Sequence, residues 1–450
     1  MTGMERIVIV GGVAAGMSAA SKVRRASADM DVVVFERGSF VSYSACGLPW
    51  FICGMIPNQS SLIARSPEQF AKAGVKVNVR HEVTEIDAQR QRVKVRDLSA
   101  GSDFYQPYDR LLIATGSQAV RLPIPGFDLP GVFQLRTLED GIALRSFVQA
   151  EQPKRAVIVG GGYIGLEVVE CFKALGMDTT VVDIAPRVLM TTFDADMSAM
   201  VETELAHQGV TLSVLDGVAG FEGKKRVTAV VTQNNRFPAD VVVVSLGIRP
   251  NTALAQSIGV RLGQTGAIAV DDHMRTNVEG VYSGGDCAEA HHVVTGQEAY
   301  IPLGSTANKQ GRTAGANMAG GDAAFRGVVG TAVSKVFGLE VARTGLTEEH
   351  ALQAGYGVRS TKVDAHAIAA YFPGATSLTV KLVVETDTGR LLGGQIIGPK
   401  GAAKRIDVLA TALHQHMTID DLRALDMSYA PPFAPVWDPI LVAANVAAKD

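Results

Sequence analysis

One cysteine, Cys46, stands in the segment 42–49 (SYSACGLP), shortly after an apolar stretch that ends in Glu36. The residues that follow it, 48–52, are apolar and predict the start of a helix. Because the N–H groups and the dipole of a helix N-terminus favour a negative charge, we expect the pKa of the Cys46 thiol to fall below the usual value of about 8.5. The thiolate is the nucleophilic form of cysteine, so the segment predicts thiol redox chemistry.

The same strand–turn–helix pattern occurs twice in the chain. Apolar strands at residues 7–10 and 156–159 each lead into a glycine-rich turn, at 11–16 and 160–165. In such a turn the first glycine allows the sharp bend and the last lets the helix pack on the strand. The backbone N–H groups at the start of the helix then meet a pyrophosphate.

Each copy is followed by a second apolar strand that ends in an acidic residue, Glu36 in the first copy and Asp183 in the second. A carboxylate at this distance accepts hydrogen bonds from the hydroxyl pair of a ribose. The first copy has Val13 where the pattern usually has its central glycine. Two such units in one chain predict two bound dinucleotides rather than one.

Three further segments extend this pattern. The apolar stretches 108–116 and 240–247 predict buried strands that each end in a glycine turn. The segment 276–286 predicts a strand that delivers the carboxylate of Asp286 to the start of a helix. There the carboxylate can accept from a sugar hydroxyl, although a plain helix cap has the same appearance in a sequence.

The composition narrows the class of protein. A length of 450 residues, 47% of them hydrophobic, predicts about three well-buried domains. The net charge of −3 argues against nucleic acid or an anionic membrane surface as a partner. Charges interrupt the apolar runs before they reach the roughly 18 residues of a membrane span, so we expect no membrane association. The four cysteines are too scattered for a disulfide scaffold, which indicates a reducing, cytoplasmic location.

The chain changes character after about residue 325, where no glycine fingerprint occurs. Strand-like stretches alternate there with helix-like ones. We expect strands at residues 333–337, 377–385 and 391–397, and helices at 347–354 and 400–416. The segment 429–439 is rich in proline and aromatic residues, which fits a loop held against a partner surface.

Together these motifs resemble the FAD-dependent pyridine nucleotide-disulfide oxidoreductases over essentially the whole chain. The resemblance implies an α/β fold, with two Rossmann-like dinucleotide-binding domains and a C-terminal α+β dimerisation domain. It implies a discontinuous FAD-binding domain at residues 1–117 and 249–324, and an NAD(P)H-binding domain at 118–248. The dimerisation domain is then expected at 325–450, and the protein is expected to be a homodimer.

The resemblance also implies which residues contact the cofactors. The expected FAD contacts are Gly11, Gly16, Glu36, Thr115, Gly116 and Asp286. The expected contacts to the reduced nicotinamide dinucleotide are Gly160, Gly162, Gly165 and Asp183. Tyr163 is similar to the aromatic gate over the nicotinamide pocket, although a packed aromatic at a helix start is an equal alternative. Further expected cofactor contacts are Gly12, Ala14, Ala15, Arg37, Ser42, Ile164 and Gly247.

Within this family the chain is similar to coenzyme A disulfide reductase, which uses a single redox cysteine. Cys53 stands seven residues after Cys46, and on a helix that spacing is about 10 Å of rise, too far for a disulfide. The motifs that carry the similarity are at residues 42–49, 366–374, 404–408 and 429–433. It implies that Tyr371 and Tyr429 of the other subunit reach towards Cys46 as candidate acids. It further implies Lys22, Arg25 and Ser42 as contacts to coenzyme A.

We therefore expect an NAD(P)H-dependent flavoprotein that reduces coenzyme A disulfide, or related persulfides and polysulfides, through a mixed disulfide on Cys46. Asp183 favours NADH because its carboxylate repels a 2′-phosphate. The positive charge of Arg187, four residues later, can offset this repulsion, so use of NADPH stays an alternative. One alternative is an NADH oxidase or peroxidase, which is weakened because Ala14 stands where those enzymes place a histidine. Another is a flavin-bearing electron carrier in which Cys46 is structural.

Overall fold

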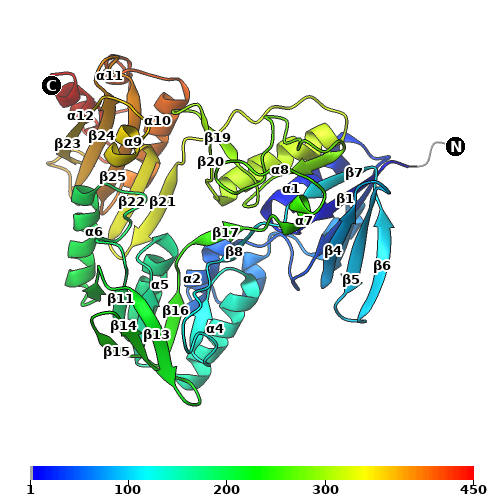
Figure 1. The fold of residues 1–450 in the computed structure, drawn as a ribbon. Coiled ribbons are helices and arrows are strands. Elements are labelled where there is room, and N and C mark those ends of the chain that lie inside the picture. Colours follow the sequence, from blue (N-terminus) through cyan, green and yellow to red (C-terminus); the bar gives the residue numbers. More distant parts are fainter. Residues whose placement is uncertain (1–3, 450) are drawn as a thin grey trace.

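Three five-stranded sheets organise the chain, each in a different part of the molecule (Figure 1). The computed structural model describes residues 4–449. Residues 1–3 and 450, which the expected domain bounds include, lie outside the described part. Among the residues described, no helix combines the length and the apolar character needed to cross a membrane.

The first sheet is parallel throughout and has the order β18-β7-β1-β2-β3. Its strands are β1 (Arg6–Val10), β2 (Asp31–Glu36), β3 (Val75–Val79), β7 (Arg110–Ile113) and β18 (Val281–Ser283). Helices α1 (Ala14–Ala26) and α8 (Gly304–Met318) share one core with Ile7 and Ile9 of β1. On the other face, Val8 and Val10 pack against the antiparallel sheet of β4 (His81–Asp87), β5 (Arg92–Asp97) and β6 (Ser102–Pro107). Both faces of the parallel sheet are therefore covered, which explains its continuous apolar strands.

The second sheet repeats this architecture with the order β12-β11-β10-β16-β9, again all parallel. Its strands are β9 (Val132–Gln134), β10 (Arg155–Val159), β11 (Asp178–Val182), β12 (Thr211–Ser213) and β16 (Val241–Val244). The helices of this unit are α4 (Leu138–Glu151), α5 (Tyr163–Ala174) and α6 (Ala195–His207). A small antiparallel sheet of β13 (Val218–Gly223), β14 (Val227–Thr232) and β15 (Arg236–Pro238) covers the other face.

The chain enters and leaves this second unit at one place. The short strands β8 (Ser117–Ala119) and β17 (Ile248–Pro250) pair antiparallel, so the two connections run side by side. Smaller elements complete the first unit. They are α2 (Leu48–Ile52), α3 (Pro67–Lys72), α7 (Ala253–Gln256), β19 (Ala290–His292), β20 (Gln297–Ala299) and the 3₁₀ turns Ala45–Gly47 and Gln59–Leu62.

The third sheet is antiparallel, with the order β21-β22-β25-β24-β23. Its strands are β21 (Ala332–Val336), β22 (Leu339–Gly345), β23 (Val358–His366), β24 (Ser377–Glu385) and β25 (Leu391–Gly398). The helices are α9 (Glu348–Gln353), α10 (Ala402–His414), α11 (Ile419–Arg423) and α12 (Pro439–Ala447). The strands and helices expected here are confirmed to within a few residues, but β22, β23, α11 and α12 were not expected. The predicted fold class is confirmed.

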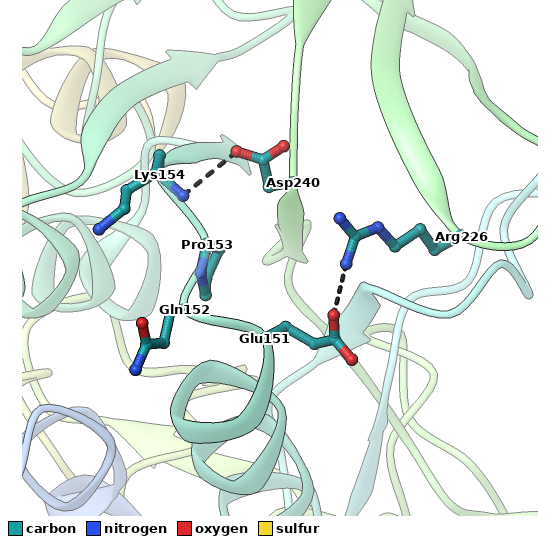
Figure 2. Close-up of a pocket in the computed structure, with 6 residues that line it drawn as sticks. All are labelled: Glu151, Gln152, Pro153, Lys154, Arg226 and Asp240. Atoms are coloured by element: carbon teal, nitrogen blue, oxygen red, sulfur yellow. Dashed lines mark hydrogen bonds and ion pairs between the residues drawn. The ribbon is translucent and has the colours of Figure 1, made fainter.

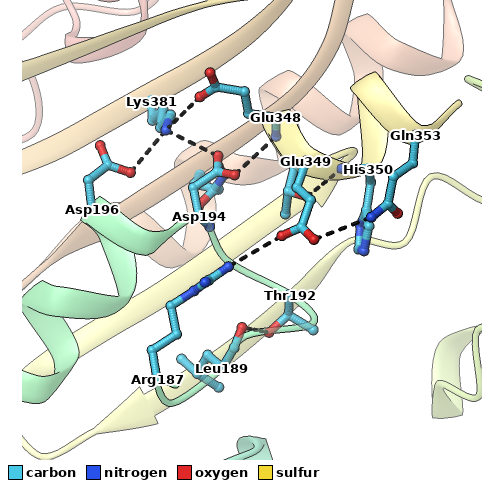
Figure 3. A network of polar contacts seen from close by, with 12 residues as sticks. Arg187, Leu189, Thr192, Asp194, Asp196, Glu348, Glu349, His350, Gln353 and Lys381 are labelled. Carbon is cyan, nitrogen blue, oxygen red and sulfur yellow. Dashed lines mark hydrogen bonds and ion pairs between the residues drawn. The ribbon is translucent and has the colours of Figure 1, made fainter. Parts of the chain in front are cut away.

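A buried lysine joins the second and third units (Figure 3). The ammonium group of Lys381, on β24, lies 3.3 Å from Asp194, 2.9 Å from Asp196 and 3.2 Å from Glu348, and its side chain is only 6% exposed. Asp194 stands just before α6 and also accepts a hydrogen bond of 2.5 Å from Gln395 on β25. Together the carboxylates hold the pKa of Lys381 above its usual value, against the effect of burial, so the lysine stays charged.

We expect Lys381→Met to destabilise the protein by about 3 kcal/mol, because removing one partner leaves buried carboxylates without their cation. The measurement is the urea unfolding midpoint, followed by circular dichroism. Lys404→Met is the matched control, since the Lys404–Asp407 pair is exposed at 90% and 56% and should contribute less than about 1 kcal/mol. Equal midpoints for the two variants would contradict the stabilising role of Lys381.

Candidate functional site

Steric contacts make two glycines of each turn irreplaceable. Gly11 has φ +107° and Gly160 has φ +110°, and a Cβ on either would lie 2.1 or 2.2 Å from a backbone carbonyl oxygen of the adjacent strand end. A Cβ on Gly16 would lie 1.9 Å from the carbonyl oxygen of Gly11, and one on Gly165 would lie 2.1 Å from that of Gly160. The expected roles in bending the chain and in close helix packing are therefore confirmed.

The helices that follow both turns present free N-termini. Neither α1 nor α5 has a side-chain cap, and neither carries an acidic residue in its first turn. The first N–H groups of these helices can therefore bind the anionic pyrophosphate of a dinucleotide. A Cβ on Gly162 would meet no atom within 4 Å. Gly162 is the counterpart of Val13, so in the second copy this position has room for a side chain.

The two acidic residues are held in the same way. Glu36 accepts hydrogen bonds of 2.7 Å from the backbone N–H groups of Gly12 and Gly38. Asp183 likewise accepts from the N–H of Gly161 at 2.7 Å. These contacts fix each carboxylate beside its glycine turn, and its remaining lone pairs can accept from a ribose hydroxyl pair. The geometry fits two dinucleotides.

Two arginines near these acidic residues are engaged elsewhere. Arg37 is largely exposed and lies 3.8 Å from Glu82. Arg187 is 19% exposed and forms an ion pair of 3.5 Å with Glu349 of α9 (Figure 3). Because Glu349 belongs to the third unit, it draws the guanidinium group of Arg187 towards that unit.

The ends of β7 and β18 in the first unit lie beside the paired strands β8 and β17. The hydroxyl of Thr115 donates to the carbonyl oxygen of Asn251 at 2.7 Å, and Gly116 follows with φ +65°. Asp286 forms an ion pair of 2.6 Å with Arg136. The expectation of a helix at Asp286 was wrong: the residue lies in a turn that leads to β19. Arg136 was missed, because its pairing with Asp286 depends on segments 150 residues apart.

Tyr163, the first residue of α5, packs against another aromatic ring. Its ring meets that of Phe193 edge to face, with centroids 6.5 Å apart, and burial raises its pKa. The next residue, Ile164, is 40% exposed. Gly247 lies after β16 with φ +88° and open space around it. The arrangement supports a packed aromatic at the helix start, and the gating role of Tyr163 stays a prediction.

Cys46 lies in the 3₁₀ turn Ala45–Gly47, directly before α2, and the residue is exposed. The prediction of a lowered pKa was wrong. Desolvation of the sulfur by surrounding atoms, followed by the charges of Glu167 and Asp286, raises the pKa of the Cys46 thiol. The helix it precedes has only five residues, so its dipole is too small to offset two carboxylates.

Glu167 is an acidic residue of the site that the sequence analysis missed. It lies on α5, one turn after Tyr163, and accepts a hydrogen bond of 3.0 Å from the hydroxyl of Ser334. Burial raises the pKa of Glu167 to about 7. The charge of Glu167 reaches the sulfur of Cys46, whose pKa it helps to raise. In the sequence, Glu167 stands four residues after Tyr163, a spacing that places both residues on one face of a helix.

A cavity of about 460 Å³ opens beside the segment that leads to Cys46. Arg25, Arg65 and Arg312 line it together with Ser42, Tyr43, Ser44 and Ala14, and none of the described residues that line it is acidic. Burial raises the pKa of Tyr43 to about 12, so its phenol remains a hydrogen-bond donor. Of the expected substrate contacts, Arg25 and Ser42 line this cavity and Lys22 does not. Arg65 and Arg312 were missed.

The two tyrosines expected to act from a second subunit lie together on the third unit. Tyr371 is 76% exposed and Tyr429 is 49% exposed. A hydrogen bond between them raises the pKa of Tyr371. Phe433 and Trp437, at 78% and 59%, extend this exposed aromatic surface. Such a surface is typical of an interface with another chain.

A second hollow, of about 170 Å³, lies in the second unit (Figure 2). Two of its charged side chains are paired with each other. Arg226 forms an ion pair of 2.5 Å with Glu151, and the backbone N–H of Lys154 donates to Asp240 at 3.2 Å. Glu151 and Arg226 therefore satisfy each other rather than a ligand.

We expect Glu167→Gln to lower the apparent pKa of Cys46 by a few tenths to about one unit, because the variant removes a nearby negative charge. The measurement is the pH dependence of iodoacetamide alkylation of Cys46 in the holoenzyme, followed by peptide mass spectrometry. Glu151→Gln, which removes a carboxylate at the end of α4, is the control. An unchanged alkylation profile in Glu167→Gln would show that its charge does not reach the sulfur.

Several known proteins are similar to this chain over nearly its full length. A Pyrococcus abyssi protein named NAD(P)H sulfur oxidoreductase (CoA-dependent) is 42% identical, over 98% of this chain and 97% of the relative. A Staphylococcus aureus protein named coenzyme A disulfide reductase is 30% identical, over 96% of this chain and 97% of the relative. A solved structure of an NAD-dependent persulfide reductase from A. fulgidus has a TM-score of 0.96 at 39% identity, covering 99% of this chain and 83% of that one.

Two family models match the chain in the order expected from its sheets. The model described as pyridine nucleotide-disulphide oxidoreductase matches residues 5–311, which include both glycine turns and Cys46. The model described as the dimerisation domain of the same family matches residues 331–439, which include the antiparallel sheet. The resemblance drawn from the motifs is confirmed, and the chain belongs to the pyridine nucleotide-disulphide oxidoreductase family.

Proposed function

We propose that this enzyme uses NAD(P)H to reduce coenzyme A disulfide, or related coenzyme A persulfides and polysulfides, through Cys46. The cavity beside the segment 42–44 carries the proposal. It offers three guanidinium groups and no carboxylate, which suits a ligand with several phosphates. Ser44 lines the cavity and stands two residues before Cys46, so a ligand held there can bring its sulfur to the thiol.

The family uses FAD and NAD(P)H, and the two glycine turns support one site for each. We assign FAD to the turn Gly11–Gly16 with Glu36, and the reduced nicotinamide dinucleotide to Gly160–Gly165 with Asp183. The domain bounds that follow are residues up to 117 and 249–324 for FAD, 118–248 for NAD(P)H and 325 onwards for dimerisation. The paired strands β8 and β17 support these bounds, because the chain passes between the units there. When bound, FAD relays the two electrons of NAD(P)H to sulfur.

Cys46 supplies the nucleophile. Its thiolate attacks one sulfur of coenzyme A disulfide, forms a mixed disulfide and releases one coenzyme A thiolate. Two electrons and a proton then convert the mixed disulfide to the Cys46 thiolate and free coenzyme A. Glu167, whose charge reaches the sulfur and whose pKa of about 7 lies near neutrality, is a candidate to exchange protons with the thiol. Tyr371 and Tyr429 of a second subunit are further candidate donors in the proposed homodimer.

The nicotinamide preference follows from the charges beside the second turn. The carboxylate of Asp183 is fixed by backbone N–H groups and repels a 2′-phosphate. Arg187, the cation that could offset it, is paired with Glu349. We therefore expect NADH to be preferred over NADPH.

The decisive test of the proposed function is anaerobic NADH oxidation with coenzyme A disulfide. We expect rapid turnover in the wild type and a loss of at least about 10³-fold in Cys46→Ser, because the covalent step requires the thiolate. NADH should still bleach the flavin of the variant, which controls for cofactor binding. No turnover in the wild type, with bleaching intact, would contradict the assignment, and oxygen consumption under air would then favour an NADH oxidase.

The cavity makes a separate prediction about substrate binding. We expect Arg312→Gln to raise KM for coenzyme A disulfide by about tenfold, since a charge-assisted hydrogen bond to phosphate contributes about 1.5 kcal/mol or more. KM for pantethine, the phosphate-free disulfide, should not change. Lys22→Gln is the control, because Lys22 does not line the cavity. Equal effects on both substrates would argue against phosphate binding by Arg312.

A further inference from the structure

Two cysteines that the reaction does not use meet between the first and second units. Cys53 is the residue at which α2 ends, and Cys171 lies in the last turns of α5. Their side chains are hydrogen-bonded to each other, and both pack in the same apolar cluster where α2 contacts α5. Both are free thiols. A disulfide requires such a close approach of two thiol groups.

The two thiols differ in a way that suits sequential attack. Cys53 is partly exposed, whereas Cys171 is buried at 1% exposure. The hydrogen bond from Cys171 lowers the pKa of Cys53, and the same contact raises that of Cys171. Cys53 is therefore the thiol that solutes reach in its nucleophilic form, and Cys171 holds its proton behind it.

We propose that Cys53 and Cys171 form a second, reversible redox pair that low-molecular-weight disulfides oxidise. The Cys53 thiolate attacks such a disulfide, forms a mixed disulfide and releases one thiolate. The sulfur of Cys171 then attacks that of Cys53, loses its proton and expels the second small thiol. One disulfide and two protein thiols thus become two small thiols and one Cys53–Cys171 bond. The pair is independent of the proposed substrate, because any accessible disulfide can serve.

The position of the pair gives its oxidation a consequence for the site. Tyr163, Glu167 and Cys171 follow one another at four-residue spacing, so they lie along one face of α5. Cys53 closes the short helix that begins directly after the Cys46 turn. A bond between Cys53 and Cys171 therefore ties the segment that carries Cys46 to the helix face that carries Glu167.

The test uses flavin-loaded Cys46→Ser protein exposed to excess pantethine. The chain has four cysteines, so this variant retains three thiols. We expect the number of thiols titrated after denaturation to fall from three to one. Peptide mapping without reductant should show a Cys53–Cys171 disulfide, with the protein lighter by two hydrogens. Dithiothreitol should restore three thiols, and the oxidised form should melt at a higher temperature because the bond closes a long loop.

Two further variants control the result. Adding Cys287→Ser should leave the loss of two thiols intact, because Cys287 is buried in another cluster. Adding Cys171→Ser should stop the reaction at a pantetheine adduct on Cys53. If the parent protein itself keeps three thiols, or stops at the adduct on Cys53, the proposal is overturned. Adding Cys53→Ser provides a second check, since it should abolish both products.

Discussion

Helix α5 has to pack on three parts of the chain at once, and the geometry of the candidate site depends on this constraint. Its N-terminus forms the second glycine turn, and its side contacts α2, which follows Cys46. Two of its carboxylates bind the third unit: Glu167 accepts from Ser334 at 3.0 Å, and Glu170 accepts from the backbone N–H of Phe337 at 2.9 Å. These contacts bury Glu167, and burial is what raises its pKa to about 7.

The charged groups around Cys46 fall into two sets of opposite sign. Glu167 and Asp286 contribute to the raised pKa of the thiol, whereas the charged side chains that line the adjoining cavity are all cationic. A mixed disulfide breaks preferentially to release the thiolate of lower pKa. A raised pKa at Cys46 therefore directs the release towards the small thiol. The cationic cavity attracts a phosphorylated thiol by charge, even though the carboxylates disfavour the resting thiolate.

The parts of the site governed by local rules could be predicted from the sequence. Glycines at a positive φ, helix starts without caps and carboxylates at strand ends are fixed by neighbouring residues, so both dinucleotide units were recognisable. The pKa of Cys46 was not, because its helix proved short and the two carboxylates that raise the pKa come from segments more than 100 residues away. Asp286 was misassigned for a similar reason, since a strand followed by an acidic residue precedes a turn as readily as a helix.

The cavity shows why residues far apart in the sequence were not predicted to share a site, although the helix packing that brings them together is simple. Helices α1 and α8 approach so closely that a Cβ on Gly311 would lie 2.2 Å from the carbonyl oxygen of Ala15, and one on Gly315 would lie 2.5 Å from that of Ala19. This small-residue seam brings Arg312 of α8 to the same hollow as Arg25 of α1. In the sequence these glycines resemble ordinary helix-weakening residues. Only the packing of the two helices reveals that they determine where the cationic side chains converge.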